Sequence, residues 1–197
     1  MEKPYAGSCE ENKHAILDVL ASLFQQTGRV LEIGSGTGQH AVFFASEMPH
    51  LDWLPTDREE NLQGIQCWID ESDVGNILPL TCLDVSQSVW PIEPVDYAFS
   101  ANTVHIMSWS HVENLFDGLE AILNRQGLFA LYGPFNYNGN YSSESNARFD
   151  QWLKQRDPRS GIRDVAELDK LAERVGLRRV DDIEMPANNR ILVWEKL

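Results

Sequence analysis

The chain has 197 residues, a length that suits one domain and leaves little room for two. Hydrophobic residues make up 43% of it and charged residues 23%, which excludes collagen-like, low-complexity and wholly disordered chains. With 16 Lys and Arg against 30 Asp and Glu, the formal net charge is −14, so a nucleic-acid backbone would be repelled. Composition therefore predicts a single packed domain over residues 1–197 with no nucleic-acid partner.

Cysteine usage and hydropathy point to the compartment. Cys9, Cys67 and Cys82 form neither a CxxC motif nor another paired spacing, and their odd number favours reduced thiols over disulfides. The start of the chain has no apolar signal segment, and no run approaches the ~18 apolar residues of a membrane span. We therefore expect a cytoplasmic protein without a membrane partner. No histidine pair stands at metal-ligand spacing beside a carboxylate, so no metal site is predicted.

Strand and helix signals alternate along the first half of the chain. Ser8 and Glu11 form a capping box that predicts a helix, and Gly28 is expected to end it. The next predicted elements are a strand over 29–33, a glycine turn over 34–38, a helix over 41–48, a strand over 51–54 and a helix that runs from a capping box of Asp57 and Glu60 to about residue 71.

The second half continues this alternation and then interrupts it. Strands are predicted over 76–83, 95–100 and 128–132, with a helix over 110–125 that starts at a capping box of Ser110 and Glu113. Residues 133–163 are rich in Asn, Ser, Gly and Tyr and predict a substrate lid with a short helix over 145–156. Asp164 caps a helix that Gly176 ends, and strands over 177–183 and 190–195 follow.

These elements define an expected topology. Strands separated by helices predict right-handed crossovers and a parallel sheet covered on both faces. The connection over 184–189 is too short for a crossover, so the last two strands should run antiparallel. The expected fold class is α/β, with a doubly wound, mostly parallel seven-stranded sheet and an antiparallel C-terminal strand. This arrangement resembles the Rossmann-like fold of class I methyltransferases.

The glycine turn is the first candidate ligand site. Glycines between a strand and a helix let a ligand approach free backbone N–H groups, although such a turn can also serve packing alone. A dinucleotide fingerprint requires glycine where Gln39 stands, which disfavours an NAD-dependent oxidoreductase. Asp57 ends the second strand, where a carboxylate accepts hydrogen bonds from ribose hydroxyls, unless it only caps the next helix. The pattern indicates a nucleoside ligand.

The segment EIGSGTG, from Glu32 to Gly38, resembles motif I of S-adenosylmethionine-dependent methyltransferases. The resemblance implies that Glu32 faces the methionine ammonium of the cofactor and that Asp84 accepts the adenine amino group, although a solvated loop aspartate is the alternative. Arg58 departs from the family, which commonly has an apolar residue on the adenine there. The cofactor-binding residues implied by the resemblance are Glu32, Gly34, Ser35, Gly36, Gly38, His40, Asp57, Arg58, Asp84, Val85, Ser100, Ala101 and Asn102.

Residues for the methyl acceptor are expected near the ends of the later strands. His105 is the first candidate for a general base, because an ordinary imidazole pKa of about 6.5 suits proton transfer near neutrality; a structural histidine is the alternative. Arg163 is expected either to clamp an acceptor carboxylate or to pair with Asp164 on the surface. Asn136 and Tyr137 complete the candidate catalytic set, and the candidate substrate-binding residues are Tyr132, Asn146, Arg163, Asn188 and Asn189.

A closer resemblance rests on motifs spread over the chain: GSGTGQHA, SANTVHIMSW, GPFNYNG, SNARFD, GIRD and MPANN. Together they resemble the domain-of-unknown-function 938 family, which includes animal methyltransferase-like protein 26 and many bacterial relatives. The resemblance runs from about residue 3 to 197. It implies an S-adenosylmethionine-dependent methyltransferase with S-adenosylhomocysteine as product, and we expect a small polar metabolite as acceptor. The alternative is a non-catalytic nucleoside-binding module that acts through a protein partner.

Overall fold

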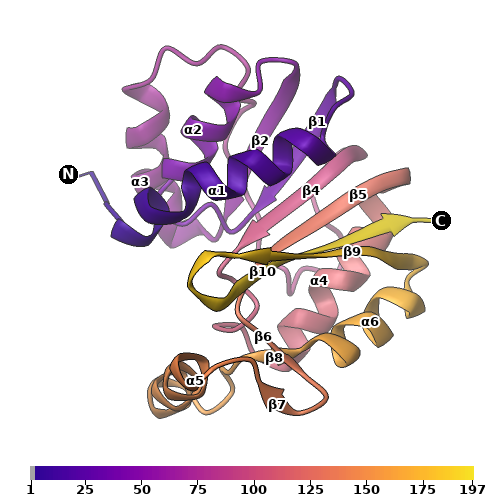
Figure 1. Cartoon of the computed structure of the whole chain (residues 1–197). Helices are drawn as coiled ribbons and strands as arrows, with labels where there is room; N and C mark the ends of the chain where they lie inside the picture. The colour runs from indigo at the N-terminus through magenta and orange to yellow at the C-terminus, as the bar shows by residue number, and fades with distance from the viewer. Residues whose placement is uncertain (1–2) are drawn as a thin grey trace.

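A computed structural model describes residues 3–197 and shows a seven-stranded sheet with helices on both faces (Figure 1). The strand order is β3-β2-β1-β4-β5-β10-β9. β10 is antiparallel to both of its neighbours, whereas the pairs from β3 to β5 are parallel. The predicted fold class is therefore confirmed. The strands of this sheet are β1 (Gly28–Ile33), β2 (Leu51–Asp57), β3 (Thr81–Cys82), β4 (Val95–Ala101), β5 (Leu123–Gly133), β9 (Leu177–Met185) and β10 (Asn189–Lys196).

The core lies on both faces of the sheet. Val30 packs with residues of the first two helices on one face, and its neighbour Leu31 packs with α4 and α6 on the other. This division follows from strand geometry, because successive side chains point to opposite faces. Figure 1 shows the same two layers around the sheet. The helices against the sheet are α1 (Gly7–Leu23), α2 (Gln39–Glu47), α3 (Glu59–Asp70), α4 (Trp109–Ile122) and α6 (Val165–Arg174).

Most of the predicted lid forms a small lobe beside the main sheet. It contains a three-stranded sheet of β6 (Phe135–Tyr137), β7 (Asn140–Tyr141) and β8 (Arg163–Asp164), together with the helix α5 (Glu144–Arg156). The helix predicted over 145–156 is therefore present. A short 3-10 helix, η1 (Pro186–Asn188), joins β9 to β10 near this lobe. Within residues 3–197, no helix has both the length and the apolar character that crossing a bilayer demands.

The first predicted helix boundaries are wrong. α1 begins at Gly7 after Ala6, which makes no side-chain cap, so Ser8 lies inside the first turn and does not form a capping box with Glu11. The helix ends at Leu23, and Gly28 is instead the first residue of β1.

Two further capping boxes are also corrected. α3 begins after Arg58, because Asp57 is still the last residue of β2. α4 is capped by the Ser108 side chain rather than by Ser110. The strand predicted over 76–83 shortens to β3 and an isolated bridge at Ile77, since the intervening Pro79 has no N–H to donate. The cap at Asp164 is confirmed.

Candidate active site

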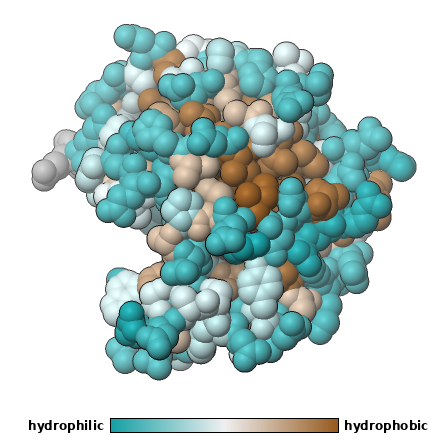
Figure 2. Space-filling model, viewed as in Figure 1, coloured by the Kyte–Doolittle hydropathy of each residue, from teal (hydrophilic) through white to brown (hydrophobic). Residues whose placement is uncertain are grey.

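A cavity of about 790 Å³ opens at the carboxyl ends of β1, β2 and β4. It lies between the main sheet and the loop after α5, and Figure 2 shows the molecule hollowed between its large upper part and the lower lobe. This edge is the switch point at which open α/β sheets bind ligands. The predicted cofactor residues that line the cavity are Gly34, Ser35, Gly36, His40, Asp57, Arg58, Asp84, Val85, Ala101 and Asn102.

The glycine turn brings the backbone to the cavity. Gly34 has φ +77°, and a Cβ there would lie 2.7 Å from Thr103 Cγ2, so the turn packs closely on the loop after β4. Gly36 has φ +62°, and a Cβ there would meet nothing within 4 Å. Because Gly36 lines the cavity, its bare backbone is open to a ligand.

The carboxylate of Asp57 holds this turn in place. Its Oδ2 accepts the Gly36 N–H at 2.7 Å, and its Oδ1 accepts the Arg58 N–H and the Asn61 amide, both at 2.7 Å. A carboxylate offers about four lone-pair sites, so one remains for a ligand hydroxyl. The sequence predicted that Asp57 accepts hydrogen bonds from ribose hydroxyls. With three hydrogen bonds already accepted from the protein, this carboxylate can accept one from a ribose hydroxyl.

Glu32 lies beneath the turn and outside the cavity wall, where it is 2% exposed. Its Oε2 accepts hydrogen bonds from Ser35 Oγ at 2.7 Å and Trp53 Nε1 at 3.2 Å. Burial raises the pKa of Glu32 to about 7, against the lowering effect of these two bonds. Ser100 and Gly38 are also absent from the cavity wall. The structure thus places Glu32, Gly38 and Ser100 behind the wall of the candidate site.

A further end of the cavity is formed by the loops after β3 and β4. Asp84 Oδ1 accepts the Ser86 N–H at 2.8 Å, and hydrogen bonds with Ser86 lower the pKa of Asp84. The guanidinium of Arg58 lies 3.8 Å from Asp84 Oδ2 and pairs with Glu60 at 2.5 Å. Ile106 is 60% exposed and lines this end as an apolar surface. The sequence analysis missed Ile106, although it stands beside His105.

The start of α1 supplies a further wall that the sequence analysis missed. Pro4, Ala6, Ser8 and Cys9 line the cavity. The backbone N–H of Ala6 donates to Gln39 Oε1 at 2.6 Å, which fixes this segment to the helix after the glycine turn. No local pattern around residue 6 indicates this contact, because its partner is far away in the sequence.

His40 joins the same two segments. Its Nε2 lies 2.8 Å from Asn12 Oδ1, and burial lowers the pKa of His40 to about 4. The ring is therefore neutral at pH 7 and acts as a hydrogen-bonding wall rather than a cation.

The candidate base His105 lies behind the wall and not in it. The residue is 5% exposed, and its Nδ1 is buried without a hydrogen-bond partner among residues 3–197. Burial, with a smaller contribution from Arg163, lowers the pKa of His105 to about 4. The backbone carbonyl of His105 accepts the Gly161 N–H at 2.9 Å. The side chain is thus a buried, neutral imidazole.

Arg163 fastens the loop that carries His105. Its Nε donates to the Val104 carbonyl at 3.0 Å, and its Nη2 donates to the carbonyls of Met107 and Arg159. The guanidinium is therefore engaged with the backbone, whereas Asp164 caps α6 by accepting the Ala166 N–H at 2.9 Å. This arrangement favours a positioning role for Arg163 over an acceptor clamp.

Replacing Arg163 with alanine should lower the free energy of unfolding by about 2–4 kcal/mol. The change leaves the carbonyl of the buried Val104 without its donor, at ~1–3 kcal/mol, and also removes the donor of the partly buried Met107 carbonyl. Urea unfolding measures the effect, with the exposed Arg148→Ala as control. Equal stability of the two variants would contradict the positioning role.

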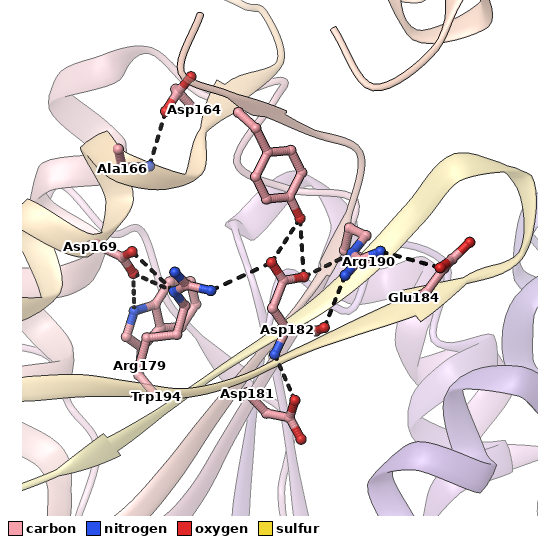
Figure 3. A network of polar contacts seen from close by, with 10 residues as sticks. Asp164, Ala166, Asp169, Arg179, Asp181, Asp182, Glu184, Arg190 and Trp194 are labelled. Carbon is pink, nitrogen blue, oxygen red and sulfur yellow. Dashed lines mark hydrogen bonds and ion pairs between the residues drawn. The ribbon is translucent and has the colours of Figure 1, made fainter. Parts of the chain in front are cut away.

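Tyr137 and Asp182 connect the lobe to the main sheet. The Tyr137 hydroxyl donates to the two Asp182 oxygens at 2.8 and 3.0 Å, and burial followed by this contact raises the pKa of Tyr137 to about 12. Figure 3 shows Asp182 between Arg179 and Arg190, and Arg190 Nε lies 2.8 Å from Asp182 Oδ1. Tyr137 is not part of the cavity wall. Asn136, by contrast, has a buried Oδ1 without a partner among residues 3–197.

The remaining candidate substrate residues hold the lobe and the β9–β10 connection together. Asn146 Nδ2 donates to the Asn188 carbonyl at 3.1 Å, and Asn188 Nδ2 donates to Ser145 Oγ at 3.3 Å. Tyr132 is buried, and burial raises its pKa, with hydrogen bonds to Asn12 and Asn189 opposing the rise. These candidates lie outside the cavity wall. In the part of the chain from residue 3 onwards, no group of three or more His, Cys, Asp or Glu could hold a metal ion.

Strand order and site position define the fold of class I methyltransferases, and solved structures share it. The chain is similar to an O-methyltransferase family 2 protein from Planctomyces limnophilus DSM 3776, crystallised with apigenin. The TM-score is 0.84 at 17% identity, over 97% of this chain and 59% of that one. Residues 3–196 match the family described as "Protein of unknown function (DUF938)", and the chain belongs to this family. The resemblance found in the sequence is thereby confirmed.

Two other solved structures show the same likeness. CalO1, a methyltransferase in calicheamicin biosynthesis solved in its SAH-bound form, gives a TM-score of 0.75 at 17% identity, over 96% of this chain and 54% of that one. An O-methyltransferase family protein from Burkholderia thailandensis gives a TM-score of 0.80 at 10% identity, over 93% of this chain and 56% of that one. The chain thus spans a little over half the length of these proteins, and at such identities the likeness concerns the fold.

Proposed function

We propose that the chain is an S-adenosylmethionine-dependent methyltransferase that acts on a small polar metabolite. The observation that carries the proposal is the cavity of about 790 Å³, whose wall combines the open glycine turn with Asp57 and Asp84. A cavity of this size accommodates a nucleoside-sized ligand, since ligand pockets commonly measure ~300–1,000 Å³. The polar groups also fit, because the open turn exposes backbone to the methionine part of the ligand and the two carboxylates can accept from ribose hydroxyls and from an amino-substituted ring.

Four residues of the wall, with Glu32 behind them, take part in holding this ligand. The remaining lone pair of Asp57 accepts a ribose hydroxyl, and Asp84 accepts the adenine amino group. Val85 and Ile106 pack on the adenine ring. Glu32 lies behind the wall and stabilises the turn by accepting the hydrogen bond of the Ser35 hydroxyl. Bound S-adenosylmethionine supplies an electrophilic methyl group on sulfur.

The acceptor side rests on His105 and its loop. His105 is proposed as the general base, because its neutral ring has an unpartnered nitrogen among the described residues. Asn136, with an unpartnered carbonyl oxygen in the same part of the chain, is proposed to contact the acceptor. Tyr137 and Arg163 are proposed as positioning residues, and the lobe is proposed as the substrate lid. We expect His105→Gln to lower turnover more than cofactor affinity.

Titration calorimetry with S-adenosylmethionine and S-adenosylhomocysteine tests the cofactor. Micromolar binding of either supports the proposal, and binding of neither at millimolar concentration contradicts it.

The second candidate function is a non-catalytic nucleoside-binding module, and the absence of His105 from the cavity wall favours it. Incubation with a labelled methyl donor and a metabolite extract separates the two. The enzyme transfers label to a metabolite, whereas the module transfers none.

A further inference from the structure

The segment before α1 forms one wall of the cavity, and the proposed reaction gives it no role. Pro4 and Ala6 of this segment line the cavity together with Asn61 and Gly64 of α3. Figure 1 shows the start of the chain beside α3. We call residues 3–6 the N-terminal strap. Its two wall residues carry no charge, so the strap covers this side of the cavity with apolar side chains and backbone.

The strap is attached to one face of α3. The Trp68 Nε1–H donates to the Pro4 carbonyl at 2.7 Å, and Lys3 Nζ lies 3.6 Å from the centre of the Trp68 ring. Lys3 Nζ also pairs with Glu71 Oε2 at 2.6 Å. Gly64, Trp68 and Glu71 share this face, because residues three and four positions apart are neighbours on a helix.

Gly64 allows the strap to lie close against the helix. A Cβ on Gly64 would lie 2.7 Å from Pro4 Cγ, closer than side chains normally approach. Glycine is unfavourable inside a helix, and the contact with Pro4 accounts for its presence here. One turn earlier, the Asn61 amide donates to Asp57, the residue proposed to hold the ribose. The strap therefore lies beside the ribose part of the proposed ligand.

The other end of the strap is attached to the glycine turn through Gln39. The oxygen Gln39 Oε1 accepts hydrogen bonds from the Ala6 N–H at 2.6 Å and from Thr37 Oγ1 at 2.9 Å. Gln39 is 3% exposed, and its Nε2 donates to Glu10 Oε1 at 2.9 Å. One buried amide thus connects the strap, the first turn of α1 and the turn that lines the cavity.

Few apolar contacts support the strap. Within residues 3–197, neither hydrophobic core cluster includes a strap residue, and the Tyr5 side chain is 66% exposed. The strap thus depends on its contacts with α3 and with Gln39. Segments with few buried apolar contacts open locally while the rest of a domain stays folded. The strap is therefore a wall that opens without unfolding the sheet.

We propose that the N-terminal strap closes the cofactor site and that Trp68 is a positioning residue that sets how fast the ligand leaves. This inference rests on the proposed methyltransferase function and adds the control of ligand retention. Trp68 is not part of the cavity wall, so it acts through Pro4. When its hydrogen bond to Pro4 breaks, the strap moves off Gly64 and that side of the cavity opens to solvent.

Two measurements on Trp68→Phe test the strap. The variant keeps an aromatic ring for Lys3 and loses only the N–H that holds Pro4. Surface plasmon resonance should show that S-adenosylhomocysteine dissociates about threefold faster or more, because the lost hydrogen bond stabilises the closed strap. Amide exchange followed by NMR should show a faster exchange of the Ala6 N–H, which the closed strap holds on Gln39. Trp152→Phe, on α5 and 48% exposed, is the matched control and should behave as the wild type does.

A third measurement uses the wild type alone and does not depend on the folding of a variant. Saturation with S-adenosylhomocysteine should slow exchange of the Ala6 N–H. The Gly139 N–H, which donates to an Asp164 oxygen in the lobe, is the control amide and should not respond. An unchanged Ala6 exchange in the saturated protein overturns the proposal, as does a wild-type dissociation rate in Trp68→Phe. Absence of S-adenosylhomocysteine binding to the wild type instead contradicts the proposed function, whereas binding with an unresponsive strap contradicts the strap alone.

Discussion

Replacing Asp57 with alanine should weaken S-adenosylhomocysteine binding by about 100-fold or more. A hydrogen bond from a ribose hydroxyl to this carboxylate contributes ~1.5–3 kcal/mol, which corresponds to roughly 10- to 140-fold in affinity. The substitution also removes the acceptor for the Gly36 N–H and the Arg58 N–H, so the turn itself loosens. Both losses act on the same ligand, and for this reason the expected effect is large.

Calorimetry at constant salt measures this affinity. Asp57→Asn keeps the side-chain volume and one acceptor oxygen, so its affinity should lie between those of the wild type and the alanine variant. Asp52→Ala, on the same strand but exposed, is the matched control and should bind as the wild type does. Unchanged affinity in Asp57→Ala would contradict both a ribose hydrogen bond to Asp57 and a binding role for the turn that it holds.

The arrangement of the main sheet could be predicted because the spacing of apolar residues along the sequence indicates each strand and helix locally. Short apolar runs alternate with helical spacing, and the brief connection over 184–189 allows only an antiparallel neighbour. Helix starts were less predictable. Ser8, Ser110 and Asp57 are all good capping residues by type, yet a cap forms only where the chain turns, and the sheet decides that point.

The residues of the candidate site also include some that the sequence predicts and others that it does not. Gly36, Asp57 and Asp84 stand at or just after strand ends, so contiguous motifs place them at one edge of the sheet. The wall at Ala6 depends on Gln39, which lies on another helix, and no local signal carries that information.

The residues proposed for the acceptor side show most clearly that tertiary contacts could not be predicted from the sequence. Tyr137 stands near a strand end as predicted, but its hydroxyl is taken by Asp182, a partner 45 positions away. Arg163 is likewise taken by carbonyls of the loop that begins after β4. Residue type and position suggested free polar groups, whereas tertiary packing had already satisfied them.

Replacing Glu32 with glutamine should make the stability of the protein less dependent on pH between about 5 and 8. Burial raises the pKa of Glu32 from 4.5 to about 7, so the folded protein holds a proton that the unfolded chain releases. The folded state therefore loses stability as pH rises from 4.5 through 7, and the full cost is present above pH 7. At 1.36 kcal/mol per tenfold change in the protonation equilibrium, this cost is on the order of 3 kcal/mol.

A glutamine side chain at position 32 cannot ionise, and its carbonyl oxygen still accepts from Ser35 and Trp53. The variant should therefore match the wild type near pH 5 and exceed it in free energy of unfolding at pH 8, as urea titrations at the two pH values would show. Glu47→Gln, on the exposed face of α2, is the matched control and should follow the wild type throughout. If the Glu32→Gln variant and the wild type lose the same stability between these pH values, the titrating proton belongs to another group, and Glu32 is ionised in the folded protein.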